Sequence, residues 1–255
     1  MEEFEGFMKV LDKANFHADI GKSQFMENMK SYLESITQKR YSINIYNDTI
    51  KDIINKITAT NIPEFINQLD LPLYSDWQIS GNKSENTNKN DVLEINRNFD
   101  GFVVNTASMF DSLGCLMREI YIHRWKETKR YFRGFSDYFK NYHKKEPLST
   151  LLSSEIDDTD STGWFYRLCG YRDTTTHVQV IKIMWTPLQN QAGVNQIGGY
   201  LPDHPYRLPL SYSDNLELTP FIEDIYKKVE NLPEIFINCI KFDVLNNKNI
   251  PLFEK

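Results

Sequence analysis

The chain has 255 residues and a net charge of −6, and 40% of its residues are hydrophobic, which is enough to bury a core. The negative charge argues against a protein that coats nucleic acid non-specifically, because such binding relies on Lys and Arg that neutralise phosphates. Three cysteines without a C-x-x-C spacing argue against a disulfide framework or a structural zinc site, and favour a reducing compartment. No apolar run has membrane-spanning length and no secretory signal is visible, so we expect a cytoplasmic protein with no membrane partner.

Helical periodicity dominates the first third of the chain. Apolar residues recur every three or four positions over 23–39 and 47–57, and a short helix is expected at 62–69. The segment "GNKSENTNKND" at 81–91 has no apolar anchor and is typical of an exposed linker. We therefore expect three parts: an N-terminal helical region (1–80), a polar linker (81–91) and a helical bundle (92–255).

The longest periodic segment predicts a helix over about 92–143. Its apolar stripe consists of Phe102, Met109, Phe110, Leu113, Leu116, Met117, Ile120, Tyr121 and Trp125. Gly114 or Gly134 is expected to mark a bend, because Gly is poor in a helix interior. "KKEPLST" ends this helix, and the acidic loop "SSEIDDTDST" precedes a short helix at about 162–171.

The pattern then changes period. "THVQVIKIMW" is dense in β-branched residues and predicts a strand, and the Gly, Pro and Asn residues that follow indicate a hairpin-like insertion near 178–212. The last helix is expected to begin at Thr219-Pro220, and Pro233 is expected to break or kink it. The chain is therefore predicted to be mainly α with a small β insertion.

Candidate chemistry lies in "RDTTTH", where Arg172 and His177 are five positions apart with polar residues between them. A His with an ordinary pKa near ~6.5 exchanges protons at neutral pH, and an Arg presents a fixed fork of donors that matches phosphate oxygens. Asp173 is positioned to orient Arg172, and the hydroxyls of Thr174 and Thr176 are suited to phosphate. These groups would support metal-free cleavage of a phosphodiester.

The same spacing occurs a second time in "REIYIH", at Arg118 and His123. This copy falls inside the long predicted helix, where five residues correspond to about 140° around the axis and the two side chains diverge. Its intervening Ile120, Tyr121 and Ile122 are typical of packing. We interpret this copy as structural, whereas the polar residues of "RDTTTH" favour an element boundary, where functional side chains often lie.

The stretch "FYRLCGYRDTTTH" resembles the R-x4-6-H signature of HEPN domains, and the resemblance extends over about residues 92–245. It implies a helical bundle that forms a homodimer and places two motifs across a shared cleft. Many members are metal-independent endoribonucleases of toxin–antitoxin or anti-phage systems, and others are non-catalytic binding modules. The resemblance implies Arg172 and His177 as the active pair, Asp173 as the polar position, an RNA substrate and an antitoxin or regulatory partner. The β-rich insertion before the last helix departs from this pattern.

Basic residues interleaved with aromatics over 124–145 are a second feature suited to RNA. Lys129, Arg130 and Arg133 are the candidate RNA-binding residues there, together with Thr174 and Thr176. The aromatic residues of this segment share one helical face and are expected in the core. No metal ligand set and no cofactor site are predicted.

Three hypotheses stay open from the sequence. The first is a HEPN-like endoribonuclease, with His177 as proton carrier and Arg172 as phosphate clamp. The second is a non-catalytic HEPN-like module that binds a protein or nucleotide. The third is a helical scaffold, for which Arg172 should be buried against Asp173 or another carboxylate.

Overall fold

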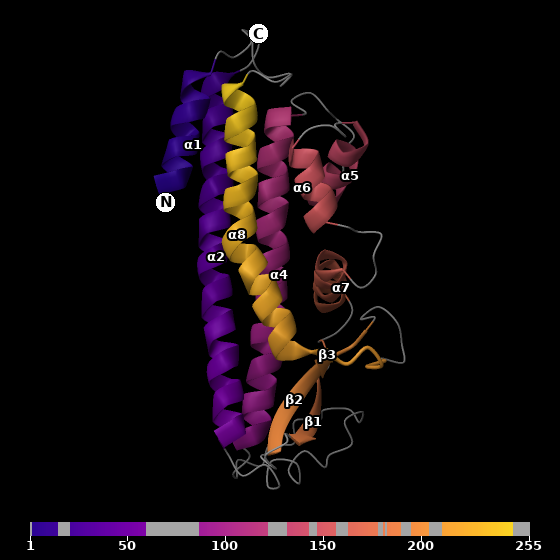
Figure 1. The fold of residues 1–255 in the computed structure, drawn as a ribbon. Helices are drawn as coiled ribbons and strands as arrows, with labels where there is room; N and C mark the ends of the chain where they lie inside the picture. The colour runs from indigo at the N-terminus through magenta and orange to yellow at the C-terminus, as the bar shows by residue number, and fades with distance from the viewer. Residues whose placement is uncertain are drawn as a thin grey trace. The chain divides into compact units, whose positions relative to one another are not determined.

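The computed structural model describes residues 2–14, 21–59, 87–121, 132–142, 147–156, 163–177, 181, 183–189, 195–203 and 211–246. Most of these residues are helical, which confirms the mainly α expectation (Figure 1). The helices are α1 (Glu2–Lys13), α2 (Lys22–Ala59), α4 (Thr87–Tyr121), α5 (Phe132–Tyr142), α6 (Pro147–Glu155), α7 (Trp164–His177) and α8 (Leu218–Leu245). The strands are β1 (Met184–Gln189), β2 (Asn195–Leu201) and β3 (Leu216–Glu217).

The chain forms two compact units, each assembled from separate segments. Unit 1 contains Met1–Ser42, Asn105–Arg167 and Lys227–Lys255, and unit 2 contains Ile43–Val104 and Leu168–Tyr226. Both units therefore draw on residues from before and after the predicted linker at 81–91. Thr87–Asp91 of that segment already belong to α4, because polar residues are tolerated in a first helical turn and Val92, Ile95 and Phe99 anchor the turns after it.

Helix α2 is continuous where the sequence predicted two helices at 23–39 and 47–57. The residues between those segments contain no Pro or Gly, so nothing in them ends a helix. A buried residue also recurs at every seventh position through the gap. The residues of this row are Met29, Ile36, Ile43, Ile50 and Ile57. The short helix expected at 62–69 lies outside the described residues.

The core of unit 1 is built on the second half of α4. The stripe predicted for this helix is buried as expected, except that Trp125 lies outside the described residues. The predicted helix over 92–143 is two helices, because α4 ends at Tyr121 and α5 begins at Phe132. Gly114 lies inside α4, and a Cβ there would lie 2.7 Å from the Cα of Phe132, so Gly114 lets the start of α5 approach α4 closely. Helix α6 was not predicted.

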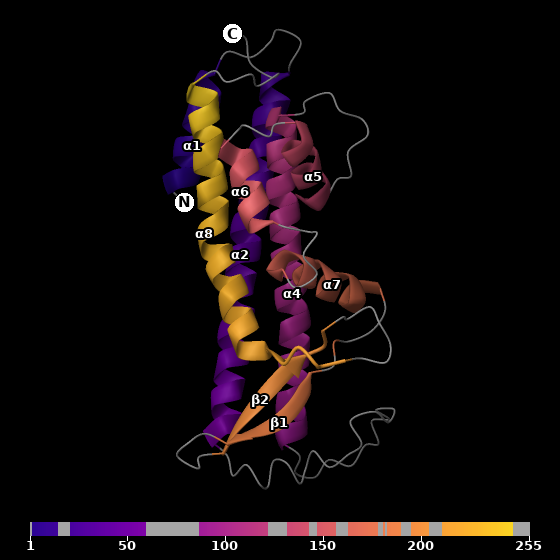
Figure 2. The same ribbon diagram turned by 45° about the vertical axis from the view of Figure 1, so that its right-hand side comes forward.

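Unit 2 contains a small antiparallel sheet of order β1-β2-β3 (Figure 2). Strands β1 and β2 pair from Met184 opposite Tyr200 to Gln189 opposite Asn195, which confirms a hairpin within the predicted insertion. The strand begins later than "THVQVIKIMW" indicated, because Thr176 and His177 still belong to α7. The hydroxyl of Thr176 donates to the carbonyl of Arg172 at 2.6 Å. This bond to the residue four positions earlier satisfies the Thr hydroxyl inside a helix.

Helix α8 begins at Leu218, one residue before the predicted cap at Thr219. Its helical assignment continues through Pro233, so the expected break does not occur. Buried Leu232 and Phe236 lie on either side of the proline and keep the helix packed there. Among the described residues, none of the helices combines the length and the apolar character that crossing a membrane requires.

Candidate functional site

The whole "RDTTTH" segment lies inside α7, which ends at His177. The sequence analysis had placed this motif at an element boundary, after a short helix at about 162–171. Helical geometry instead separates Arg172 and His177 by about 140° around the axis. The side chain of His177 lies outside the described part of the structure. Within one chain, therefore, the helix does not bring the two ends of the motif together.

The guanidinium of Arg172 forms an ion pair with the carboxylate beside it. Its Nε lies 2.7 Å from Oδ1 of Asp173, and 22% of the Arg172 side chain is exposed. Asp173 is more exposed than Arg172, so the pair opens to solvent on one side. This arrangement fits the expected orienting role of Asp173. It also fits the scaffold hypothesis, which expects Arg172 against a carboxylate.

The three threonines of the motif have three different environments. Thr174 is only 1% exposed, so its hydroxyl does not lie at the surface, where the expected RNA contact would form. Thr175 donates through Oγ1 to Oδ1 of Asp100 at 3.1 Å. Thr176 is exposed, and its hydroxyl is bonded to the backbone of Arg172. A ligand at this helix would therefore meet Arg172 and Thr176 before Thr174.

Asp100 is the functional candidate that the sequence reasoning missed. It lies on α4, is half-buried, and accepts hydrogen bonds from the Thr175 hydroxyl and from the backbone N–H of Ile181. Burial raises the pKa of Asp100 to about 6, although both hydrogen bonds act in the opposite direction. A carboxyl group whose pKa burial raises toward neutral pH, and which is hydrogen-bonded to the helix that carries Arg172, is a candidate for a functional site. The one local signal in the sequence was the stretch "NFDGF", in which Asp100 interrupts the apolar stripe of a helix.

The basic segment predicted to bind RNA is described only in part. Lys129 and Arg130 lie outside the described residues. Arg133 is exposed on α5 in unit 1, whereas Arg172 and Asp173 belong to unit 2. Phe135 and Phe139 are buried, which confirms the core role predicted for the aromatic face of this segment.

A second polar cluster, in unit 1, joins α2 and α4. The Nζ of Lys39 donates to Oγ of Ser35 at 2.7 Å and to Oγ of Ser112 at 3.0 Å, and the two hydroxyls lie 3.0 Å apart. Burial lowers the pKa of Lys39. Ser112 also bonds the carbonyl of Ser108, so its proton already has an acceptor. This network satisfies polar groups between two packed helices and does not leave a serine poised as a nucleophile.

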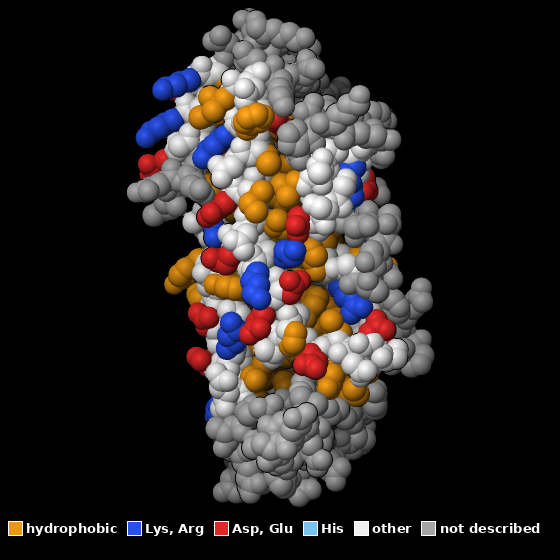
Figure 3. Space-filling view, in the orientation of Figure 1, with side chains coloured by type: hydrophobic (Ala, Val, Ile, Leu, Met, Phe, Trp, Pro, Cys, Tyr) orange, Lys and Arg blue, Asp and Glu red, His pale blue; other side chains and the backbone are white. Residues whose placement is uncertain are grey.

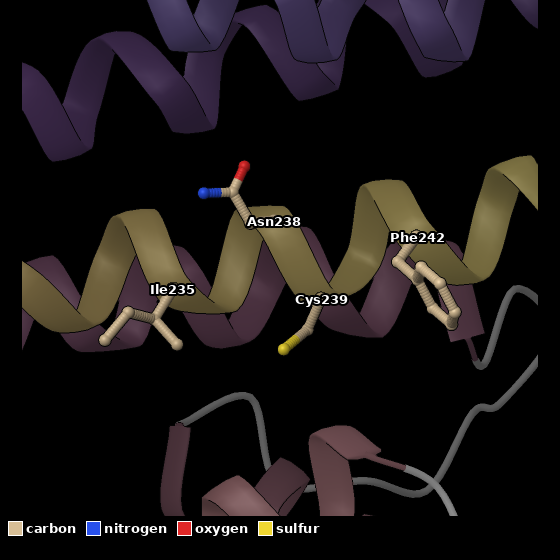
Figure 4. A pocket seen from close by; sticks show the side chains of 4 residues that line it. All are labelled: Ile235, Asn238, Cys239 and Phe242. Carbon is tan, nitrogen blue, oxygen red and sulfur yellow. The ribbon is translucent and has the colours of Figure 1, made fainter.

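The surface of unit 1 carries an apolar row on α8. Ile235, Phe242 and Leu245 are 43%, 51% and 69% exposed. Ile235, Asn238, Cys239 and Phe242 line a shallow depression of about 480 Å³, and Figure 4 shows Ile235 and Cys239 directed to the same side of the helix. Hydrophobic side chains are visible among charged ones on the face that contains α8 (Figure 3). None of the described residues that line this depression is charged, so its surface is suited to an apolar contact.

No group of three or more His, Cys, Asp or Glu side chains within the described ranges is arranged to hold a metal ion. The cysteines Cys115, Cys169 and Cys239 form no disulfide with one another. Comparison with known proteins finds no family model that matches the sequence, and no curated protein or solved structure with significant similarity. The assignment of function therefore depends on the residues of the site itself.

Proposed function

We propose that the chain is a metal-independent endoribonuclease of the HEPN type, with "RDTTTH" as its active segment. The observation that carries the proposal is the partly exposed Arg172–Asp173 pair on α7, the helix whose Thr175 donates to Asp100, a carboxyl group with its pKa raised to about 6. An Arg that is oriented but still open to solvent is suited to grip a phosphate, and a nearby titrating group is typical of acid–base chemistry.

In the proposed reaction, His177 takes the proton from a ribose 2′-hydroxyl, which then attacks the adjacent phosphate. Arg172 stabilises the negative charge that develops on the phosphate oxygens, and Asp173 orients the guanidinium. The 5′-oxygen leaves with a proton returned by the acid form of a group in the site. The products are a 2′,3′-cyclic phosphate and a free 5′-hydroxyl, and no step needs a metal ion.

A homodimer is part of this proposal. Since Arg172 and His177 diverge by about 140° on α7, one copy of the motif does not close around a single phosphate. A cleft formed by two copies of the motif would supply both groups to one substrate, as the HEPN resemblance implies. A defence or toxin role, and regulation by an antitoxin, follow from the same resemblance.

The test is an RNA cleavage assay in EDTA, with His177→Ala beside wild type. The matched control is His123→Ala, which removes the histidine of the "REIYIH" copy at the same spacing from its arginine. We expect wild type and His123→Ala to produce cyclic-phosphate ends and His177→Ala to lose at least about 100-fold in rate, the scale of general acid–base catalysis. Absence of cleavage by folded wild-type dimers would contradict the proposal.

A non-catalytic binding module is the second candidate, and the apolar row of Ile235, Phe242 and Leu245 favours it. Exposed apolar residues that share one helix face are typical of a protein contact. Phe242→Ser should then abolish partner binding or self-association while the melting temperature changes little. Tyr41→Ser is the matched control, because Tyr41 is also an exposed aromatic residue of unit 1. Sedimentation velocity measures self-association of both variants. Loss of association in Phe242→Ser but not in Tyr41→Ser, together with a wild type that cleaves no RNA, would favour this function.

A further inference from the structure

We propose that Asp100 is a positioning residue for His177, because its carboxylate accepts hydrogen bonds from groups on both sides of that histidine in the sequence. The effect of Asp100 on catalysis rests on the proposed function. The geometry behind it involves only Asp100, Thr175 and Ile181, which all belong to unit 2.

The two donors bracket the histidine closely. Thr175 is two residues before His177 and donates its hydroxyl to Oδ1 of Asp100 at 3.1 Å. Ile181 is four residues after His177 and donates its backbone N–H to the same carboxylate. Ile181 is itself buried, so its backbone is held by packing as well as by this bond. A single side chain of α4 thus joins the last turn of α7 to the backbone of Ile181.

The carboxylate is suited to this role because an ionised oxygen is a stronger acceptor than a neutral one. Protonation of Asp100 would weaken both hydrogen bonds and loosen the position of His177. The other charged or titratable groups on the neighbouring turns are Arg97 on α4 and Arg172, Asp173 and His177 on α7. A test must therefore separate the titration of Asp100 from that of His177.

The experiment follows the backbone amide signal of Ile181 by NMR from pH 4.5 to 8 in the full-length protein labelled with ¹⁵N-isoleucine. Ile181→Val identifies the signal. We expect the Ile181 amide to titrate with a midpoint near 6 in wild type and in His177→Gln. The titration should disappear in Asp100→Asn, which cannot ionise. Persistence of the titration in Asp100→Asn, or its absence from wild type, would overturn the proposal.

Cleavage kinetics supply the second readout. At pH 7.5 we expect Asp100→Asn to lower kcat about 10- to 100-fold with little change in KM, because small misplacements of a catalytic group have effects of that size. Thr175→Val removes one donor and should give a smaller loss in the same direction. Asp203→Asn is the matched control, since Asp203 also accepts from backbone and side-chain donors, those of Ser213 and Asp214.

Asp203→Asn should lower the melting temperature without changing kcat or the Ile181 signal. Equal loss of kcat in both variants would show a general effect of stability and would overturn the positioning role. If wild type cleaves no RNA, the proposed function fails, and the Ile181 titration alone still decides whether Asp100 controls this segment.

Discussion

Two copies of the R-x4-H spacing occur in the chain: "REIYIH", whose first four residues end α4, and "RDTTTH" on α7, and their arginines lie in similar surroundings. Each Arg is paired with the acidic residue that follows it: Arg118 with Glu119 at 3.6 Å and Arg172 with Asp173 at 2.7 Å. The two arginine side chains are 25% and 22% exposed. Three positions after each Arg, a hydroxyl donates to a carboxylate of another helix. A short motif is therefore a weak guide to function by itself.

The difference between the copies lies in those carboxylates. The hydroxyl of Tyr121 donates at 2.7 Å to Asp243, which is 2% exposed within the core of unit 1. The hydroxyl of Thr175 donates at 3.1 Å to Asp100, which is half-buried and titrates near pH 6. The Tyr121–Asp243 bond satisfies a carboxylate inside a core, whereas the Thr175–Asp100 bond involves a titratable group that is partly accessible to solvent. Four predictions separate these two roles.

The largest effect is expected for Tyr121→Ala. Tyr121 packs against the rings of Phe135 and Phe139 and is almost fully buried. Its removal should lower the free energy of unfolding by about 3–5 kcal/mol, the usual cost of deleting a buried aromatic ring. Urea unfolding measures this loss. A cost below about 1 kcal/mol would mean that the "REIYIH" copy is not part of the core.

Tyr121→Phe should have the next largest effect. It keeps the ring but leaves the buried carboxylate of Asp243 without this donor, at a cost of about 1–3 kcal/mol. The same urea measurement applies. A neutral result would show that Asp243 finds a replacement donor or water.

Thr175→Val should destabilise the fold less, by about 1 kcal/mol, because water can replace the hydroxyl at a half-buried carboxylate. It should also raise the pKa of Asp100 further, since the Thr175 hydrogen bond is one of the interactions that lower it. Carboxyl carbon shifts of Asp100 followed by NMR would measure this change. An unchanged or lowered pKa would contradict the observed hydrogen bond.

A further prediction concerns the pH dependence of stability that Asp100 contributes. Its pKa in the folded protein is about 6, above the ordinary value of 3.8, so the folded state binds this proton more tightly than the unfolded chain. The contribution is present in full below about pH 3.8 and is lost as the pH rises through about 6. Urea unfolding between pH 4 and 7 should show wild type losing stability relative to Asp100→Asn. Parallel curves for the two proteins would contradict the raised pKa.

Periodicity in the sequence was enough to predict most helices and the buried stripe of α4, because apolar spacing reports directly on which face is buried. It did not reveal that α2 is one helix, since the polar residues between Ile36 and Ile50 conceal the buried Ile43. It also ended the predicted helix too early at the "RDTTTH" segment. The hydrogen bond between Thr175 and Asp100, which are 75 residues apart, stabilises that turn. Nothing in the sequence near Thr175 indicates this partner.

The candidate site was predictable only in part for the same reason. Arg172 and Asp173 are adjacent in the sequence, so their pairing could be expected. Asp100 comes from a distant helix, and its raised pKa results from burial that only the folded chain produces. Thr174 was expected to contact phosphate, but the helix turns its side chain into the protein.

The most direct test of the account compares Arg172→Ala with Arg118→Ala in the same RNA cleavage assay in EDTA. The two arginines match in exposure and in pairing with the next acidic residue, so Arg118→Ala controls for the loss of a half-buried, paired arginine. We predict that Arg172→Ala abolishes cleavage while Arg118→Ala retains it at the wild-type rate per folded molecule. Equal activity of the two variants, whether both active or both inactive, would contradict a catalytic role for "RDTTTH".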